Sequence, residues 1–323
     1  MKKRNLLAVC FVAASGLLSG PASAENWPTR PITWIVPFAA GGNFDLIARI
    51  VAKELSAELK QPIIIDNKPG AGGMLGASFV VRAKPDGYTF LVGGNGVVTN
   101  TLIRSDQPYK DEDLTPVAPL SIAPSVTVVG PNSPFKDLKA LVEDAKGKGL
   151  AKVPFATAGV GSSPHFVAGL FKVASGLDIE PIQYKSGQET ILAVASGQVP
   201  IASESVSVVA PLVSGGRVKA VAVTLPHRSP LLPNVPTTKE LGLPAMEMGH
   251  FVGIWAPAAV PAPILDGLNA SIRKVLASED VRKAYARSGT ETMVQTRPEF
   301  AEAMKVERER LKKVVAAAGM NDQ

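Results

Sequence analysis

The sequence predicts an α/β protein of two lobes, each built on a mostly parallel sheet flanked by helices. Apolar strand-like runs alternate with helical runs along both halves of the chain, which is typical of parallel sheets. A unit of strand, glycine-containing loop and helix at 32–60 recurs at 153–175. A strand-rich segment with prolines, 117–130, separates the halves and suits a crossing between lobes. We expect one lobe over 25–124 and 250–323, and the other over 125–249.

The first half is expected to hold three strands with helices between them. Each strand is an apolar run of five or six residues, and each helix shows apolar residues at a period of 3.6. The expected strands are 32–37, 62–66 and 88–92, the expected helices are 45–60 and 75–83, and 93–96 is expected to be a loop.

The second half repeats this alternation. The segment 225–250 is rich in Pro and Leu and is expected to be irregular. Ser163 is the expected N-cap of the helix after the second glycine loop, with Pro164 at its first position. The expected strands are 153–157, 179–184, 199–203, 218–224 and 251–256, and the expected helices are 135–146, 166–175, 264–278 and 298–318.

The first 24 residues have the pattern of an export signal. Lys2, Lys3 and Arg4 precede an apolar run too short to span a membrane, and Ala22-Ser-Ala24 is a small-x-small cleavage pattern. We therefore expect a periplasmic protein that begins at Glu25. Lipid attachment at Cys10 is the alternative. Cys10 is the only cysteine, so the mature chain forms no disulfide.

The charge pattern argues against nucleic-acid binding. The chain has 34 basic and 28 acidic residues, and loss of the three cations of the signal lowers the net charge from +6 to +3. No dense basic block alternates with aromatic residues. No later run reaches membrane-spanning length without a Gly, a Pro or a charge.

The loop at 36–45 is the most informative segment. A strand, a small-residue loop and a helix start together present unpaired backbone N–H groups at the positive end of the helix dipole. Such a unit suits an anion, either a carboxylate or a phosphate. The second unit has its loop at 159–165, so the two lobes could close on one anionic ligand.

Other chemistries find little support. The glycines at 70–76 miss the dinucleotide-binding spacing and are interpreted as a tight turn into a helix. His165, His227 and His250 do not have metal-site spacing, and the chain lacks a nucleophile elbow. We therefore expect no catalytic residues, no metal and no cofactor.

Three residues have two interpretations each. His165 either structures its loop or contacts ligand. Glu204, at the end of an apolar strand, either lies in the cleft or is a solvated turn acid or a partner of Lys185. Phe44 either packs as a hydrophobic staple or faces a ligand ring or alkyl chain.

A series of motifs spread over nearly all of 25–320 resembles the solute-binding proteins of tripartite tricarboxylate transporters, the TctC or Bug family. The motifs are Pro-x-Arg-Pro-Ile at 28–32, Val-Pro-Phe-x-x-Gly-Gly-x-x-Asp-x-x-Ala-Arg at 36–49, Asn-x-Pro-Gly-Ala-Gly-Gly at 67–73, Pro-Asp-Gly-Tyr at 85–88, Gly-x-Gly-Ser-Ser-x-His at 159–165, Gly-Gln-Val at 197–199, Gly-x-x-x-Ala-x-Ala-Val-Thr at 216–224 and Trp-Ala-Pro at 255–257.

The resemblance implies a type II periplasmic binding protein fold with a Venus-flytrap cleft, a small organic-acid ligand and no catalysis. Carried over by position, it implies that both loops grip a carboxylate, partly through bridging waters. The implied ligand-binding residues are Phe38, Ala39, Ala40, Gly41, Gly42, Asn43, Phe44, Asp45, Gly93, Asn95, Gly159, Gly161, Ser162, Ser163, His165, Ser203 and Glu204.

Two positions depart from the family pattern. The family usually has a small hydroxyl residue where this chain has Phe44, and Phe-Asp where it has Ser203-Glu204. Both departures fall in the implied pocket, so the ligand class of other members need not transfer.

We expect a monomer that delivers its ligand to the membrane permease subunits of such a transporter. Two alternatives are an exported sensor whose closed form docks on a receptor, and a serine hydrolase using Ser162 or Ser163 with His165.

Overall fold

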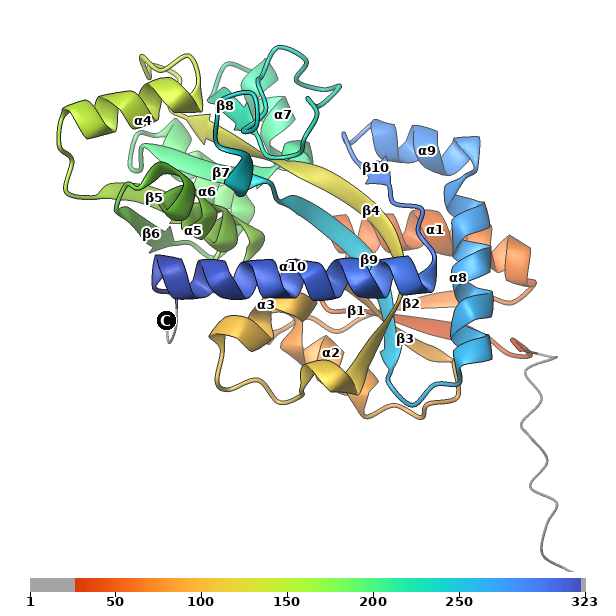
Figure 1. Ribbon diagram of the computed structural model, residues 1–323. Helices are drawn as coiled ribbons and strands as arrows, with labels where there is room; N and C mark the ends of the chain where they lie inside the picture. The colour runs from red at the N-terminus through yellow and green to blue at the C-terminus, as the bar shows by residue number, and fades with distance from the viewer. Residues whose placement is uncertain (1–26, 321–323) are drawn as a thin grey trace, which may run out of the picture.

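The computed structural model describes residues 27–320 and has two lobes joined by two long strands (Figure 1). The expected signal at 1–24 and Cys10 lie outside these residues. The α/β class is confirmed. Each lobe contains three parallel strands, but antiparallel pairings extend both sheets, so the sheets are mixed rather than mostly parallel. No helix among the described residues combines the length and the apolar character needed to cross a membrane.

One lobe is built on three parallel strands in the order β2-β1-β3. The strands are β1 (Ile32–Val36), β2 (Ile63–Asn67) and β3 (Thr89–Gly94). Its helices are α1 (Asn43–Leu59), a 3-10 turn η2 (Ala71–Gly73) that leads into α2 (Met74–Val81), α3 (Asn95–Ile103), the 3-10 turn η3 (Asp111–Asp113), α8 (Ala262–Leu276) and α9 (Glu279–Ala286).

The other lobe repeats the arrangement with parallel strands in the order β7-β5-β6. These strands are β5 (Val153–Thr157), β6 (Ile179–Gln183) and β7 (Ile201–Ser205). A fourth strand of this lobe, β8 (Lys219–Val223), has an antiparallel neighbour. The helices are α4 (Leu138–Gly147), α5 (Ser163–Ser175), α6 (Gly187–Ala195), α7 (Val206–Ser214) and the 3-10 turn η4 (Pro244–Met246).

Two antiparallel strands, β4 (Leu114–Val129) and β9 (Gly249–Pro257), connect the lobes. The first part of β4 pairs with β9 and with the short β10 (Glu291–Thr292), and its last residues pair with β7 and β8. β9 in turn pairs with β3. Strand β4 therefore belongs to the sheets of both lobes and links them through backbone hydrogen bonds.

The long last helix, α10 (Arg297–Ala318), lies along both lobes (Figure 1). Near its start, Phe300 packs against Phe251 and Trp255 of β9. Near its end, Leu311 and Val315 join the core around α5. The lobe ranges expected from the sequence stay predictions, and the structure adds that α10 contributes apolar residues to both cores.

Most expected elements are present with ends shifted by a few residues. The expected loop at 93–96 is wrong, because β3 continues to Gly94 and α3 starts at Asn95. Helices α3, α6, α7 and α9 were not expected. Of these, α3 matters most here, because it starts where β3 ends and lines the candidate site.

Candidate functional site

The loop between β1 and α1 makes a tight turn before the helix begins. The amide of Gly42 donates to the carbonyl of Ala39 (3.3 Å), and Gly41 has a φ of +81° that favours glycine. Ala39, Ala40, Gly41 and Gly42 are exposed, and Asn43 opens the helix. The predicted loop therefore presents backbone to solvent at a helix start.

Asp45 fixes this loop from beneath. Its Oδ2 accepts hydrogen bonds from the Gly41 amide (2.9 Å) and from Arg49 Nε (2.9 Å), and its Oδ1 accepts one from Asn67 Nδ2 (3.0 Å). Asn67 also donates to the Phe38 carbonyl (3.1 Å). The Arg49 hydrogen bond, with help from Gly41 and Asn67, lowers the pKa of Asp45 to about 2. The buried carboxylate thus stays ionised and holds the loop in shape.

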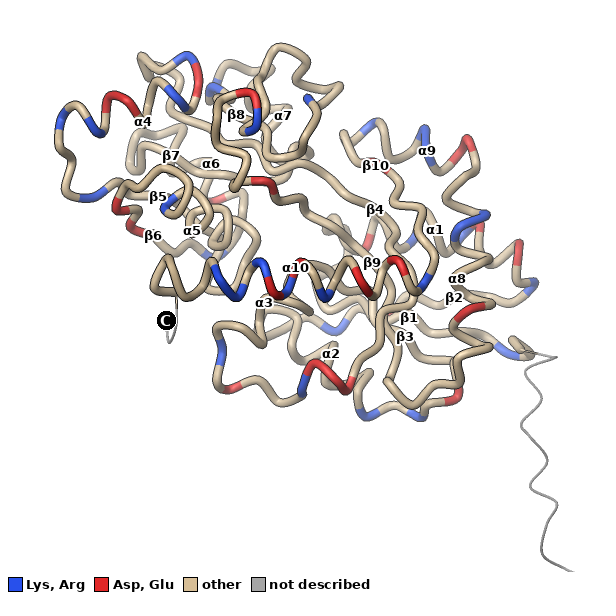
Figure 2. Tube along the Cα trace, in the orientation of Figure 1, with Lys and Arg blue, Asp and Glu red and all other residues tan. Residues whose placement is uncertain are grey.

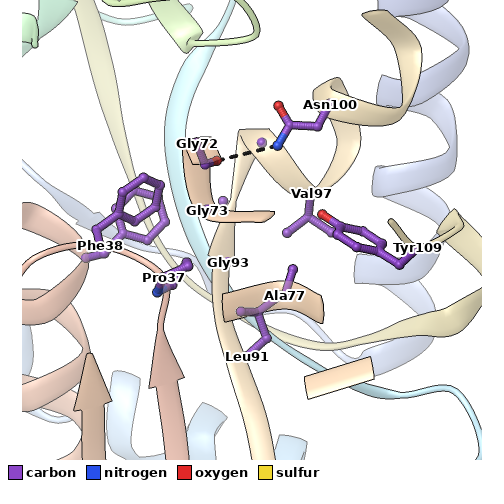
Figure 3. A pocket seen from close by; sticks show the side chains of 13 residues that line it. Pro37, Phe38, Gly72, Gly73, Ala77, Leu91, Gly93, Val97, Asn100 and Tyr109 are labelled. Carbon is purple, nitrogen blue, oxygen red and sulfur yellow. Dashed lines mark hydrogen bonds between the residues drawn. The ribbon is translucent and has the colours of Figure 1, made fainter. Parts of the chain in front are cut away.

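A small cavity lies beside this loop and involves three strand-to-helix connections of the same lobe (Figure 3). Phe38 and Phe44 come from the first connection, Gly72 and Gly73 from the second, and residues 93–97 from the third. The lining residues are Pro37, Phe38, Phe44, Gly72, Gly73, Ala77, Leu91, Gly93, Gly94, Gly96, Val97, Asn100 and Tyr109.

Three helices start around this cavity with a glycine at the N-cap. Gly42, Gly73 and Gly94 cap α1, α2 and α3, and none of the three helices has a side-chain cap. Among the α-helices of residues 27–320, only these have a glycine N-cap. Side chains instead cap α4, α5, α6, α9 and α10. Several helix N-termini in the first lobe are therefore free of side-chain acceptors where the cavity lies.

Phe38 and Phe44 form an aromatic pair at the cavity, with ring centroids 4.5 Å apart. Phe44 is half-buried and also packs on the core of the lobe, close against Gly94. A Cβ at Gly94 would lie 2.6 Å from the Phe44 ring, so the glycine makes room for the ring. Phe44 thus packs like a staple and also lines the cavity.

In the second lobe, the loop between β5 and α5 is held mainly by its own side chains. The Ser162 hydroxyl donates to the Gly159 carbonyl (2.7 Å) and accepts from the His165 amide (3.3 Å). The expected N-cap at Ser163 is therefore wrong by one residue, because Ser162 supplies the capping oxygen and Pro164 lies one position further into the helix.

His165 lies under the same loop with its ring fully buried. Its Nδ1 accepts a hydrogen bond from the Gly161 amide (3.2 Å). Gly159 and Gly161 have φ values of +100° and +81°, which glycine adopts without strain. These contacts support the loop-structuring interpretation of His165.

Helix α3 contacts the loops of both lobes. The Thr99 hydroxyl lies within hydrogen-bond distance of two carbonyl acceptors, those of Asn95 in its own helix (3.0 Å) and of Gly161 (3.1 Å). The Asn100 side-chain amide donates to the Gly72 carbonyl (3.5 Å). A Cβ at Gly161 would lie 2.8 Å from Asn100 Oδ1, so the second-lobe loop packs directly on α3. One short helix therefore separates the first-lobe cavity from the loop at 159–163.

The remaining predicted residues lie at strand ends. Asn95 bonds β9 through the Gly249 carbonyl (3.0 Å) and the Phe251 amide (3.2 Å), while Gly93 lines the cavity. Ser203 is fully buried in β7. Both polar atoms of the Asn95 side chain are therefore hydrogen-bonded to β9.

Glu204 is 7% exposed, which rules out the solvated-turn interpretation. Its Oε2 accepts from the Ser205 amide (3.0 Å), and its carboxyl group lies against Gly187, at the start of α6. Burial raises the pKa of Glu204 to about 7. The ion pairs of the described residues do not include one between Glu204 and Lys185.

Several cavity residues were not expected from the sequence. The glycines at 72 and 73 were interpreted only as a tight turn, although their loop follows a strand of the same sheet as the first loop. Val97, Asn100 and Tyr109 were missed because α3 was expected to be loop. The rule that all loops at the carboxyl edge of a parallel sheet meet would have indicated 70–73.

The site has no sign of metal chemistry within the described residues, since they contain no group of three or more potential His, Cys, Asp or Glu ligands. Figure 2 shows acidic and basic residues spread over both lobes, alternating in sign along α10. No charged side chain lines the first-lobe cavity.

Comparison with known proteins gives the family. A family model described as the tripartite tricarboxylate transporter family receptor, TctC, matches residues 47–320. The structure of the periplasmic binding protein BugD is 29% identical, with a TM-score of 0.77, and the match covers 92% of this chain and 100% of BugD.

Two solved relatives are described with bound acids. Rpa4515 of R. palustris, with adipate, is 30% identical with a TM-score of 0.80, over 91% of this chain and 99% of that one. MatC of Rhodopseudomonas palustris, with bound malate, is 31% identical with a TM-score of 0.76, over 90% and 100%.

These matches confirm the expected periplasmic binding protein fold and the expectation of a binding protein rather than an enzyme. Membership of one family accounts for the sequence motifs, the two glycine loops and the crossing strands. The chain belongs to the TctC family of tripartite tricarboxylate transporter receptors, which are solute-binding proteins.

Proposed function

We propose that this protein captures a small organic carboxylate in the periplasm and delivers it to the membrane permease of a tripartite tricarboxylate transporter. Residues 1–24 would direct export and be removed. The ligand carboxylate would bind between the loop at 38–45 and the loop at 159–165, as an anion shared by two helix N-termini.

The observation that carries this proposal is the start of α1. Gly42 leaves that helix without a side-chain cap, whereas five of the ten α-helices within residues 27–320 have one. Orphan amides at a helix start attract a carboxylate through hydrogen bonds and the helix dipole. Because Asp45 and Arg49 neutralise each other beneath the loop, they leave the attraction of these amides in place.

The loop of the second lobe supports the other half of the site. Ser163, next to the N-cap, is half-buried, and Gly161 contacts α3 of the first lobe. The acids bound by Rpa4515 and MatC support a carboxylate for this chain as well. Hinge bending of β4 and β9, the two strands that connect the lobes, would let the loops close on the ligand.

A thermal-shift screen tests the proposal. Mono-, di- and tricarboxylates, including aromatic acids, are compared with the neutral amide of each acid. Binding at about 100 times the dissociation constant adds about 2.7 kcal/mol of stability, so a true ligand raises the melting temperature by several degrees. The proposal predicts a rise with at least one acid and none with its amide. Equal shifts with acid and amide, or shifts only with cations or sugars, would contradict it.

A further inference from the structure

We propose that this protein has a second ligand site, a groove between α3 and the start of α10 that binds a small organic anion with an apolar body. We call it the α10 groove. Residues of α3, η3, β4, β9 and α10 line it, among them Val98, Leu114, Trp255 and Met304. No residue of the loops at 38–45 and 159–165 lines it, so this site is separate from the one in the proposed function and does not depend on it.

The α10 groove has room for a ligand of several heavy atoms. Its volume is about 230 Å³, whereas about 10–15 Å³ suffices for one water molecule. It lies where α10 packs beside α3 (Figure 1). Arg308 of α10 ties the walls together, because it pairs with Asp111 of η3 (2.6 Å) and donates to Thr101 Oγ1 of α3 (2.6 Å). Closure of the two lobes is therefore not needed to form the groove.

The lining of the α10 groove is largely apolar. Leu114 and Pro116 come from β4, Trp255 from β9 and Val98 from α3. Met304 comes from α10, and its flexible thioether side chain can adapt to the shape of a ligand. Moving the apolar body of a ligand from water onto such surfaces is favourable. The lining thus suits an alkyl chain or an aromatic ring.

Trp255 offers a hydrogen-bond donor at this groove. Its indole N–H makes no hydrogen bond within residues 27–320, although the residue is only 3% exposed. Trp34 Nε1 and Tyr285 Oη are also unpartnered, but those atoms are fully enclosed, whereas Trp255 Nε1 is not. A buried tryptophan usually finds an acceptor for its N–H. An oxygen of a ligand in the groove would supply one.

The charges at the groove favour an anion. Apart from the neutral pair of Arg308 and Asp111, the charged lining residues are Lys110 and Lys305. Their own ion pairs are long, 3.7 Å to Glu112 and 4.0 Å to Glu302, and all four side chains are mostly exposed. Exposed pairs of this kind contribute little, and the flexible lysine side chains can turn toward a carboxylate at the mouth of the groove.

Hexanoate and hexanamide are the matched probes. They share one alkyl chain, and only hexanoate has a charged head group. In NMR titrations of the protein with isotope-labelled methionine methyl groups, the Met304 signal, assigned with Met304→Leu, should shift saturably with hexanoate at a millimolar or tighter dissociation constant. Hexanamide should bind at least about threefold more weakly. No saturable Met304 shift with hexanoate, or equal affinity for hexanamide, overturns the inference.

A groove-filling variant separates this site from the loops. Ala301 of α10 lines the groove and is half-buried, so Ala301→Leu places bulk in it. The variant should lose the saturable shift of Met304. Ala317→Leu, at an exposed position of the same helix, is the control and should keep it. A Met304 shift that persists in folded Ala301→Leu would report a ligand bound elsewhere and would contradict the assignment.

A charge variant tests the contact with the anion without altering the groove walls. Combining Lys110→Gln with Lys305→Gln should weaken hexanoate by about threefold or more and leave hexanamide unchanged. Combining Lys312→Gln with Lys313→Gln, both exposed near the other end of α10, is the control and should change neither. Hexanoate affinity unchanged by the first pair of substitutions would sink the anion assignment. Failure of any of these tests leaves the proposed function standing, because its ligand binds at the loops.

Discussion

Asp45 is the residue on which the shape of the first loop depends most. One nearly buried carboxylate accepts from Gly41, Arg49 and Asn67. Asp45→Asn loses an acceptor for Gly41 and Arg49, and leaving such donors without a partner costs about 1–3 kcal/mol. We expect a loss of that size at pH 7 in urea denaturation, together with weaker carboxylate binding.

Asp106→Asn is the control for this change. Asp106 also accepts two hydrogen bonds from an arginine, but its side chain is 66% exposed, so its loss should cost under about 1 kcal/mol. The stabilising effect of Asp45 is present above its usual pKa of 3.8 and is lost as the pH falls toward about 2. A cost for Asp45→Asn no greater than that for Asp106→Asn would contradict this role.

Glu204 should show the opposite dependence on pH. Its raised pKa, about 7 against the usual 4.5, means that the folded protein keeps a proton that the unfolded chain has lost between these values. Stability therefore falls as the pH rises through this window, by roughly 3 kcal/mol. Glu204→Gln removes that cost.

We therefore expect Glu204→Gln to be more stable than wild type at pH 8, by up to roughly 3 kcal/mol, and to differ by less than about 1 kcal/mol at pH 4.5. Urea denaturation at both pH values checks this. Glu302→Gln, on the exposed face of α10, should change stability by no more than about 0.5 kcal/mol at either pH. The same stability difference for Glu204→Gln at both pH values would disprove the account.

At the level of elements, helix α2 packs closely against Pro37, just after β1, because Gly76 has no side chain. A Cβ at Gly76 would lie 2.7 Å and 2.9 Å from Cβ and Cα of Pro37. Gly76→Ala should therefore destabilise the protein by about 1–3 kcal/mol, although alanine is the better helix former. The matched change Gly267→Ala, with open space around the new Cβ, should stabilise it by about 0.5–1 kcal/mol. Thermal or urea unfolding distinguishes the two, and stabilisation by both changes would be the contrary result.

The alternation of strands and helices could be predicted because strong apolar periods mark α1, α8 and α10 and short apolar runs mark β1, β3 and β5. Helix α3 could not, since Asn95, Gly96 and several β-branched residues have low helix propensity. Tertiary contacts stabilise α3 instead: Asn95 bonds to the Gly249 carbonyl of β9, and Thr99 contacts the Gly161 carbonyl of the second-lobe loop. Helix α7 was not predicted for a similar reason: Pro211 lies inside it, and proline is a poor helix former.

The candidate site was predictable to the same extent. The sequence indicated the loops at 38–45 and 159–165 through their glycines, and it indicated the role of Asp45 only as a helix start. The third side of the cavity, at 72–73 and on α3, depends on which strands become neighbours in the sheet. Without a structure, no local pattern places Gly72 beside Asn100.

At the scale of the whole molecule, the two lobes share β4, β9 and α10. Separate cores form in each lobe, while these three elements cross between them. Such an arrangement permits bending at the crossing strands without unfolding either core. Closure around a ligand would then bring the loop of the second lobe onto the first-lobe cavity, next to α3.

The most direct test of the central claim is a crystal structure of the protein, purified without refolding, with the tightest-binding carboxylate of the screen. We predict that the carboxylate oxygens accept hydrogen bonds, directly or through one water, from backbone amides within 41–45 and within 159–163. A carboxylate bound away from both loops would contradict the account.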